Sequence, residues 1–368
     1  MKPTSIISLI IAVLLTIVGL VTCFIAQNMA KSSGEQLFAD RSDGNATITE
    51  EFDPKNLERI SIVFSSGKVN IYGNCDDRSS PHFSSVCKFE VVNFGENDYV
   101  FKATGSKVEF NETLALDRLK FWENGFSFKG MRYILNLEQI RAFFNKEKEE
   151  DEKEKQINVY LTRQATAALI EETEGEAEEA AEEVVWKLNQ IQIKATGADG
   201  CDVTIQNISI DTDYNIIANR VGLTLKDIST NSAVKVIEGT GGTETCAKSA
   251  DVSVENAALR YFYVKADKMT FESRGLSFHL TQDAAPVEES AESTEKENLT
   301  LTTESGEIRI SIPYSMEILN SEIRSTGRIL VDNEDRSNPY THVAGSGNPT
   351  IKVTGGEADV TMVAETNP

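Results

Sequence analysis

The stretch Gly200-Cys201-Asp202-Val203-Thr204-Ile205 shows the pattern that decides the fold of this 368-residue chain. Val203 and Ile205 are separated by one polar residue, and this spacing places both side chains on the same face of an extended strand. The pattern recurs from Gln190 to the carboxyl end, with mainly Gly, Asn, Asp and Ser between the pairs. The other pairs are Ile191/Ile193, Ile208/Ile210, Leu223/Leu225, Val234/Val236, Val252/Val254, Tyr261/Tyr263, Met269/Phe271, Leu276/Phe278, Leu299/Leu301, Ile308/Ile310, Ile329/Val331 and Ile351/Val353.

Each pair predicts a short strand, and runs of helical period are absent from this region of the sequence, so we predict an all-β fold. Short strands at near-regular spacing fit a sandwich, a barrel or a stack of rungs. Hairpin sandwiches normally show Asn-Gly or Asp-Gly turns, and only Asp199-Gly200 qualifies within the patterned region. We therefore predict a parallel β-solenoid of stacked short-strand rungs, with a β-sandwich as the alternative.

The amino end carries 22 residues without a charge, from Ser5 to Ala26. A helix of this length covers the roughly 30 Å hydrocarbon layer of a membrane. A cleavable signal peptide would have a shorter apolar core and an Ala-x-Ala-like cleavage site, which this segment lacks. We predict an uncleaved transmembrane anchor over residues 5–26, with residues 1–4 in the cytoplasm and the body outside the cell membrane. The alternatives are a removed signal and a lipid attached to Cys23.

After the anchor we predict a spacer over residues 27–53 and a solenoid body over residues 54–368, with insertions near 111–156, 164–187 and 283–298. The formal net charge of the chain is −22, and three segments carry most of it. They are Lys146 to Lys155, Glu171 to Glu183 and Asp283 to Glu297, and together they carry −15. We interpret these acids as keeping protruding loops in solvent, with cation or partner binding as the alternative. The apolar spacing from Arg132 to Lys155 predicts an amphipathic helix that packs on the solenoid or caps an end of it.

The exported part of the chain contains an even number of cysteines. Cys75 and Cys87 bracket a turn-rich loop between two strand-like runs. A disulfide that closes this loop would stabilise the protein by roughly 3 kcal/mol, and two unpaired thiols are the alternative. Cys201 and Cys246 are too far apart in sequence to predict a pairing.

No motif in the sequence indicates a metal site. The histidines His82, His279 and His342 each lack a second His or a Cys at ligand spacing, and His82 is interpreted as an exposed loop residue. The segments Asp332-Asn333-Glu334-Asp335 and Asp211-Thr212-Asp213 lack the calcium-loop pattern. We interpret both as turns, with cation binding as the alternative.

No motif indicates catalysis or a cofactor either. The sequence contains no Gly-x-Ser-x-Gly elbow and no P-loop, and Gly239 to Glu244, which departs from the dinucleotide fingerprint, is interpreted as a turn. We therefore expect no cofactor and no enzyme activity, with a polysaccharide-active enzyme as the remote alternative. An acidic surface repels phosphate, and the linear sequence shows no basic patch with aromatics, so we expect no nucleic-acid partner.

Four segments carry a resemblance to a known family: Ile157 to Leu161, Gly200 to Ile205, Thr303 to Pro313, and Gly347 to Val353. Over Leu57 to Val363 the chain resembles the bacterial "putative adhesin" family. This resemblance implies a β-solenoid behind an amino-terminal membrane segment, and it supplies neither a ligand nor catalytic residues. The chain departs from the family at Thr162, where the family has Pro, and in its acidic insertions.

Two functions are consistent with these predictions. The first is adhesion, binding or a structural role at the cell envelope, with an envelope polymer, a host surface or a membrane protein as the partner. The alternative is envelope-stress sensing, or regulation of a partner membrane protein through the anchor.

Overall fold

The computed structural model describes residues 47–54, 57–94, 98–113, 154–162, 188–209, 211–238, 246–278, 298–313, 315–345 and 348–364. The all-β prediction is confirmed, because the elements in these ranges form one 19-stranded sheet with a short 3-10 helix, η2 (Met316–Ile318). The strands are β1 (Thr47–Glu51), β2 (Arg59–Phe64), β3 (Gly67–Tyr72), β4 (Lys88–Val92), β5 (Tyr99–Thr104), β6 (Lys107–Glu112), β7 (Gln156–Tyr160), β8 (Gln190–Ala195), β9 (Cys201–Ile208), β10 (Asp213–Ile217), β11 (Arg220–Ile237), β12 (Ala247–Phe278), β13 (Leu299–Ile312), β14 (Asn320–Arg324), β15 (Ile329–Val331), β16 (Glu334–Asp335), β17 (Tyr340–His342), β18 (Thr350–Gly355) and β19 (Asp359–Ala364).

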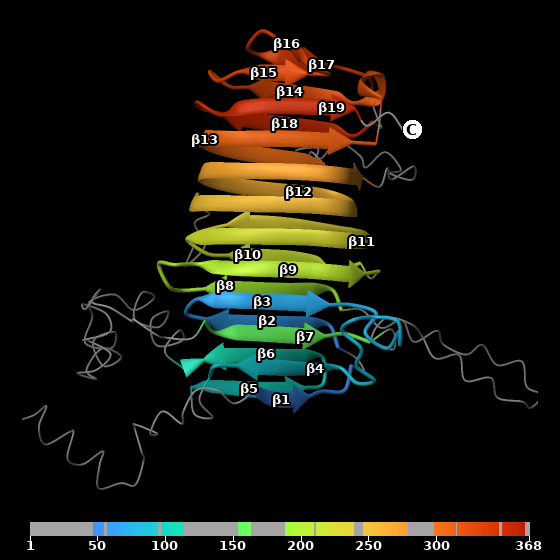
Figure 1. Ribbon diagram of the computed structural model, residues 1–368, viewed down its shortest axis with the longest axis vertical. Coiled ribbons are helices and arrows are strands. Elements are labelled where there is room, and N and C mark those ends of the chain that lie inside the picture. The colour runs from blue at the N-terminus through green and yellow to red at the C-terminus, as the bar shows by residue number, and fades with distance from the viewer. Residues whose placement is uncertain are drawn as a thin grey trace, which may run out of the picture.

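The strands lie in two rows along the long axis of the molecule (Figure 1). The first row runs β5, β6, β2, β8, β10, the second half of β11, the middle of β12, the first half of β13, β18, β14 and β17. The second row runs β1, β4, β7, β3, β9, the first half of β11, the two ends of β12, the second half of β13, β19, β15 and β16. From β8 to β13 the chain passes alternately from one row to the other, so long strands such as β12 belong to both.

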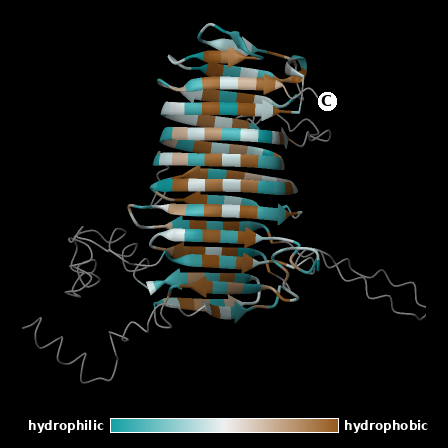
Figure 2. Ribbon diagram, viewed as in Figure 1, coloured by the Kyte–Doolittle hydropathy of each residue, from teal (hydrophilic) through white to brown (hydrophobic). Residues whose placement is uncertain are grey.

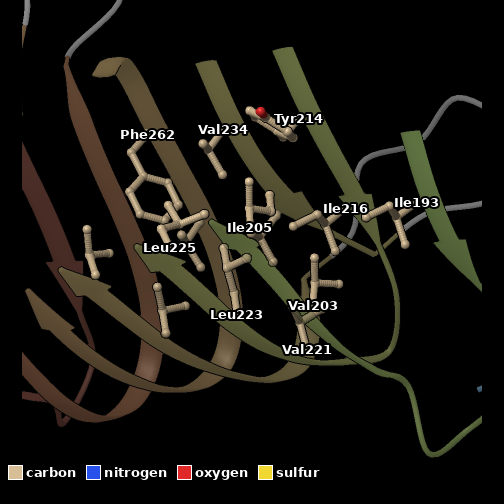
Figure 3. Packing of buried hydrophobic residues seen from close by; sticks show 14 of the residues in the cluster. Ile193, Val203, Ile205, Tyr214, Ile216, Val221, Leu223, Leu225, Val234 and Phe262 are labelled. Atoms are coloured by element: carbon tan, nitrogen blue, oxygen red, sulfur yellow. The ribbon is translucent and has the colours of Figure 1, made fainter. Parts of the chain in front are cut away.

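The apolar residues of the predicted pairs face a single core between the two rows. Neighbouring strands pair in register, so an inward residue lies on an inward residue of the next strand. One such column crosses nine strands of the first row, and every member has a relative exposure of 0%. Its members are Phe110, Ile62, Ile193, Ile216, Val236, Val264, Leu301, Val353 and Ile323. Figure 3 shows side chains of both rows directed into this core.

The residues between the inward ones face solvent, so each strand alternates between apolar and polar residues (Figure 2). Asn and Asp residues turn the chain at one corner, where Asn207, Asp227 and Asn256 have φ values of 56°, 51° and 52°. Such left-handed conformations are tolerated best by Gly, Asn and Asp. At another corner Gly200 has a φ of 75°, and a Cβ there would lie 1.9 Å from the Arg220 carbonyl oxygen. The residues that separate the predicted strands thus set the corners of the fold.

Antiparallel strands close both ends of the two rows. β5 pairs antiparallel with β6, and β1 pairs antiparallel with β4, at the lower end in Figure 1. β17 pairs antiparallel with β14, and β16 with β15, at the upper end. Elsewhere the pairings among the described strands are parallel, except for β4 with β7. The exposed ends of the sheet are therefore short strands, which limit edge-to-edge aggregation.

Several predictions of the sequence fall outside the described residues. They include the anchor over residues 5–26, almost all of the helix from Arg132 to Lys155, and most of the three acidic segments. Within the described ranges, no helix is long and apolar enough to cross a membrane. β1 lies inside the range 27–53, for which the sequence predicted a spacer.

A buried ion pair joins three segments near the lower end of the core. Glu112, at the end of β6, has a side chain only 2% exposed, and its Oε1 lies 2.7 Å from the Lys155 Nζ. The Ser65 hydroxyl donates a hydrogen bond to the same oxygen at 3.0 Å, and the Ser65 backbone N–H donates to the other oxygen. The carboxylate therefore fixes the turn between β2 and β3 against the start of β7.

We predict that Lys155→Met lowers the free energy of unfolding by about 3 to 5 kcal/mol, because it leaves the buried Glu112 carboxylate without a counter-charge. Adding Glu112→Gln should recover most of this loss, because the amide is neutral and still accepts from Ser65. Denaturant unfolding measures both effects. The control is Lys226→Met, which breaks an exposed pair with Glu255 and should cost less than about 1 kcal/mol. A loss for Lys155→Met no larger than the control would contradict the assignment.

Candidate functional site

An aromatic patch lies on the outer surface of the second row, beside the loop that joins β3 to β4. We define it as Tyr72, His82, Phe83, Val86 and Tyr160. The rings of Tyr72 and His82 are stacked, with centroids 3.6 Å apart and planes 14° apart. Tyr160 lies one strand away as the register partner of Tyr72, and the two rings are 5.5 Å apart. His82 is thus half-buried against a tyrosine, and its interpretation as an exposed loop residue is wrong.

The patch carries two exposed apolar side chains. Phe83 is 49% exposed and Val86 is 41% exposed, and both belong to the same loop as His82. The loop has a fixed shape, because the Ser84 backbone N–H donates to the Cys75 carbonyl oxygen at 2.8 Å and the Ser84 hydroxyl donates to the Val86 carbonyl oxygen at 2.6 Å. A partner that covered these two side chains would remove their apolar surface from water.

Charged groups of β4 adjoin the tyrosine of β7. The Tyr160 hydroxyl donates a hydrogen bond to Glu90 Oε2 at 2.7 Å, and Lys88 Nζ donates to Glu90 Oε1 at 2.5 Å. Lys88 Nζ also lies 4.7 Å from the centroid of the Tyr160 ring, within the range of a cation–π contact. These contacts are possible because β4 pairs antiparallel with β7, which places Lys88 opposite Tyr160.

Amide side chains lie next to these groups on β3 and β7. Asn158 Oδ1 accepts hydrogen bonds from Asn70 Nδ2 at 2.8 Å and from Gln156 Nε2 at 2.7 Å. The surface therefore combines ring faces with a carboxylate, an ammonium and amides, all on neighbouring strands. Such groups bind a polar ligand by stacking and hydrogen bonding.

The protonation states at the patch follow from these contacts. Burial alone would raise the pKa of Glu90, but the hydrogen bonds from Lys88 and Tyr160 outweigh it, and the pKa lies below its ordinary value of 4.5. Burial and the hydrogen bond to Glu90 raise the pKa of Tyr160. Burial lowers the pKa of His82. At neutral pH the patch and the adjoining Glu90 thus offer a carboxylate, a neutral phenol and a neutral imidazole.

Two buried thiols lie behind the patch, at the ends of its loop. The Cys75 Sγ donates to the Tyr72 carbonyl oxygen at 3.2 Å, and the Cys87 Sγ lies 3.4 Å from the Thr162 hydroxyl. Burial raises the pKa of Cys75 to about 11, and it also raises that of Cys87. All four described cysteines are free thiols in this structure, and the disulfide between Cys75 and Cys87 stays a prediction.

The other residues that the sequence singled out do not meet at this patch. Asp332 and Asn333 form the turn between β15 and β16, with φ values of 50° and 63°. Asp213 binds Arg260 at 2.9 Å on the first row. His279 and Gly239 to Glu244 lie outside the described residues. Within the described part of the chain, no three His, Cys, Asp or Glu side chains are grouped closely enough to hold a metal ion.

Sequence reasoning did not identify the patch. The sequence alternates apolar and polar residues over Lys68 to Tyr72 and over Ile157 to Leu161, and the outward position of Tyr72 and Tyr160 follows from that alternation. It gave no indication that these two strands are neighbours, since they are separated by more than 80 residues. The usable signal was a tyrosine at an outward position in each strand.

Comparison with known proteins adds little to this picture. No family model matches the chain, and no curated protein matches it. The solved structures that are similar to this chain include the following two. A "putative cell adhesion protein" from Clostridium sporogenes has 9% identity and a TM-score of 0.29, with 87% of this chain and 97% of that chain covered. A "putative adhesin" from Bacteroides fragilis has 11% identity and a TM-score of 0.34, with coverages of 88% and 98%. At these scores the likeness establishes neither a shared fold nor a shared function.

We predict that Glu90 stabilises the protein in a pH-dependent way. Its folded pKa is lowered, so its contribution is complete above the ordinary value of 4.5 and is lost as the pH falls through the folded pKa. The free energy of unfolding of the natural chain should therefore exceed that of Glu90→Gln at neutral pH, and this difference should shrink on acidification. Unfolding curves at several pH values measure it.

The control for this experiment is Glu255→Gln, which changes an exposed carboxylate paired with Lys226 and should have a small effect at each pH. A Glu90→Gln difference that stays constant or grows on acidification would contradict the assignment.

Proposed function

We propose that this chain is a binding or adhesion protein of the cell envelope, and that the aromatic patch is its contact surface. One observation carries the proposal. Among the described residues, five large apolar side chains are exposed, and two of them, Phe83 and Val86, share a loop with His82, which stacks on Tyr72 of β3. Burying such side chains against a partner gains hydrophobic free energy that a polar strand surface does not offer.

The chemistry of the patch favours a carbohydrate or another polar polymer as the partner. The face of an aromatic ring carries partial negative charge and attracts the C–H groups of a sugar ring. Glu90 lies beside the rings and its side chain is partly exposed, so its carboxylate can bind hydroxyl groups. The proposal includes no catalytic step and no cofactor.

The proposal places this patch on a rigid body outside the cell membrane. We interpret the two rows of strands as a parallel β-solenoid, in which parallel pairing between successive passages of the chain supports a long, regular outer surface. The uncharged residues 5–26 support a single-pass anchor with its amino terminus in the cytoplasm. A body held in this way would present its surface to envelope polymers, host surfaces or membrane proteins.

We predict that the full-length chain binds cell-wall fragments or glycans, and that Phe83→Ser with Val86→Ser weakens binding at least tenfold. Both residues are exposed, so the fold should be unaffected. The matched control is Ile318→Ser with Val343→Ser, which removes two exposed apolar residues, 45% and 77% exposed, from the other end of the body. The control should bind within twofold of the natural chain. Absence of binding across wall polymers and glycans, or equal losses in both variants, would overturn the proposal.

The proposed location has its own test. Protease added to intact cells should digest the body of the chain, and the same cells should retain a short amino-terminal fragment in their membranes. Protection of the body until the cells are lysed would overturn the proposed orientation.

A further inference from the structure

A column of uncharged polar side chains leads away from the aromatic patch along the second row. It begins on β3, two residues from Tyr72 on the same face, and crosses the next three strands of the row, β9, β11 and the first part of β12 (Figure 1). Its members are register partners from strand to strand, and each is partly or fully exposed. We call this set the polar column: Asn70, Thr204, Thr224 and Ser253.

The hydroxyl groups of the polar column can bind a ligand without breaking a contact within the protein. Among the described residues, the side chains of Thr204, Thr224 and Ser253 form no hydrogen bond with another group of the chain. A hydroxyl donates one hydrogen bond and accepts others. Gln206 lies next to Tyr72 on the neighbouring strand, and it is partly exposed. The column and the aromatic patch therefore form one continuous surface.

This surface is long and narrow. Tyr160 and Ser253 are four strand-to-strand steps apart, along β7, β3, β9, β11 and β12. Neighbouring strands are about 4.8 Å apart, so the two residues start about 19 Å from each other. The polar column lies two residues from the tyrosines along each strand, which is about 7 Å. Such a shape matches a single linear chain of sugar rings that lies across the strands.

Two carboxylates border the polar column on one side. Asp202 lies two residues from Thr204 on the outward face of β9. Asp251 lies two residues from Ser253 on the outward face of β12. The strand between them carries Gly222 at the matching position, where a Cβ would lie 2.3 Å from Asp202 Oδ1. The Asp202 carboxylate therefore extends over the Gly222 backbone, and sugar hydroxyls can donate hydrogen bonds to it.

The cations beside the polar column are held in ion pairs. Lys226 Nζ lies 3.2 Å from Glu255 Oε2, and Lys68 Nζ lies 2.6 Å from Glu154 Oε2. The groups that border the column therefore carry no excess of positive charge, and the whole chain has a formal net charge of −22. Such a surface repels a polymer that bears carboxylate, sulfate or phosphate groups, and it does not repel an uncharged one.

We propose that the aromatic patch and the polar column together bind one linear neutral polysaccharide, which runs along the long axis of the body. The patch stacks against the sugar rings at one end of the bound stretch, and the column binds the hydroxyl groups of the sugars that follow. This inference rests on the proposed function, because the patch is part of the same surface. It adds the class of the ligand, its direction and the length over which it is held.

The test uses the full-length chain and a variant with Thr204→Val, Thr224→Val and Ser253→Ala. These changes remove three hydroxyls at exposed strand positions, where valine is also favoured. The matched control makes the same kinds of change on the outward face of the first row, with Thr302→Val, Thr354→Val and Ser61→Ala. The probes are neutral linear disaccharides and octasaccharides of glucose or of N-acetylglucosamine, and a uronate octasaccharide.

We expect the natural chain to bind a neutral octasaccharide more tightly than its disaccharide, with an affinity that salt does not change. The polar-column variant should lose at least tenfold in affinity for the octasaccharide and stay within twofold for the disaccharide, which is too short to reach beyond the patch. The control variant should stay within twofold for both. Phe83→Ser with Val86→Ser should weaken both lengths at least tenfold.

Three results would overturn the polar column and leave the proposed function standing. They are an unchanged affinity of the polar-column variant for the octasaccharide, an equal loss in the control variant, and tighter binding of the uronate than of the neutral octasaccharides. Absence of binding to every glycan, neutral or acidic, would overturn the proposed function together with this inference. The two failures are therefore distinguishable.

Discussion

The packing of each inward side chain on its counterpart one strand away is the interaction on which the rest of the structure depends. Ile193, Ile216 and Val236 are consecutive members of one such column, and each is completely buried. Burial of a side chain of this size contributes roughly 1.5 to 3 kcal/mol relative to exposure. Parallel, in-register pairing repeats the same contact along both rows, so the core is continuous although most single strands are short.

At each end of the rows the last layer has no neighbour, so its strand edge would be left unpaired. Near both ends the strands pair out of sequence order. β2, which comes early in the chain, lies between β6 and β8, and β18, which comes late, lies between β13 and β14. β2 and β18 are therefore paired on two sides, and short antiparallel strands form the outermost layers. The outward residues are free to vary within this frame, and the aromatic patch is one result.

The sequence predicts the strands better than it predicts their neighbours. Alternation at Val203 and Ile205 predicts a strand with one buried face, and the polar separators predict where the chain turns. It does not predict that Tyr72 adjoins Tyr160, because the two positions are 88 residues apart in the sequence and the pairing depends on strands that pair out of sequence order. The stacked His82 was also missed, because its environment depends on how one loop folds back on β3.

The strands are stacked in one fixed order at a constant spacing, and pulsed electron spin resonance tests this arrangement directly. Pairs of spin labels on outward residues of the first row would be measured in the full-length chain, with its native cysteines replaced. Along the first row, Tyr263 lies four strand-to-strand steps from Ser61, and Lys352 lies six steps from Ser61. Glu322 lies nine steps from Lys102. At about 4.8 Å per strand the account predicts backbone separations of about 19, 29 and 43 Å. Distances that fail to rise in this order would contradict it.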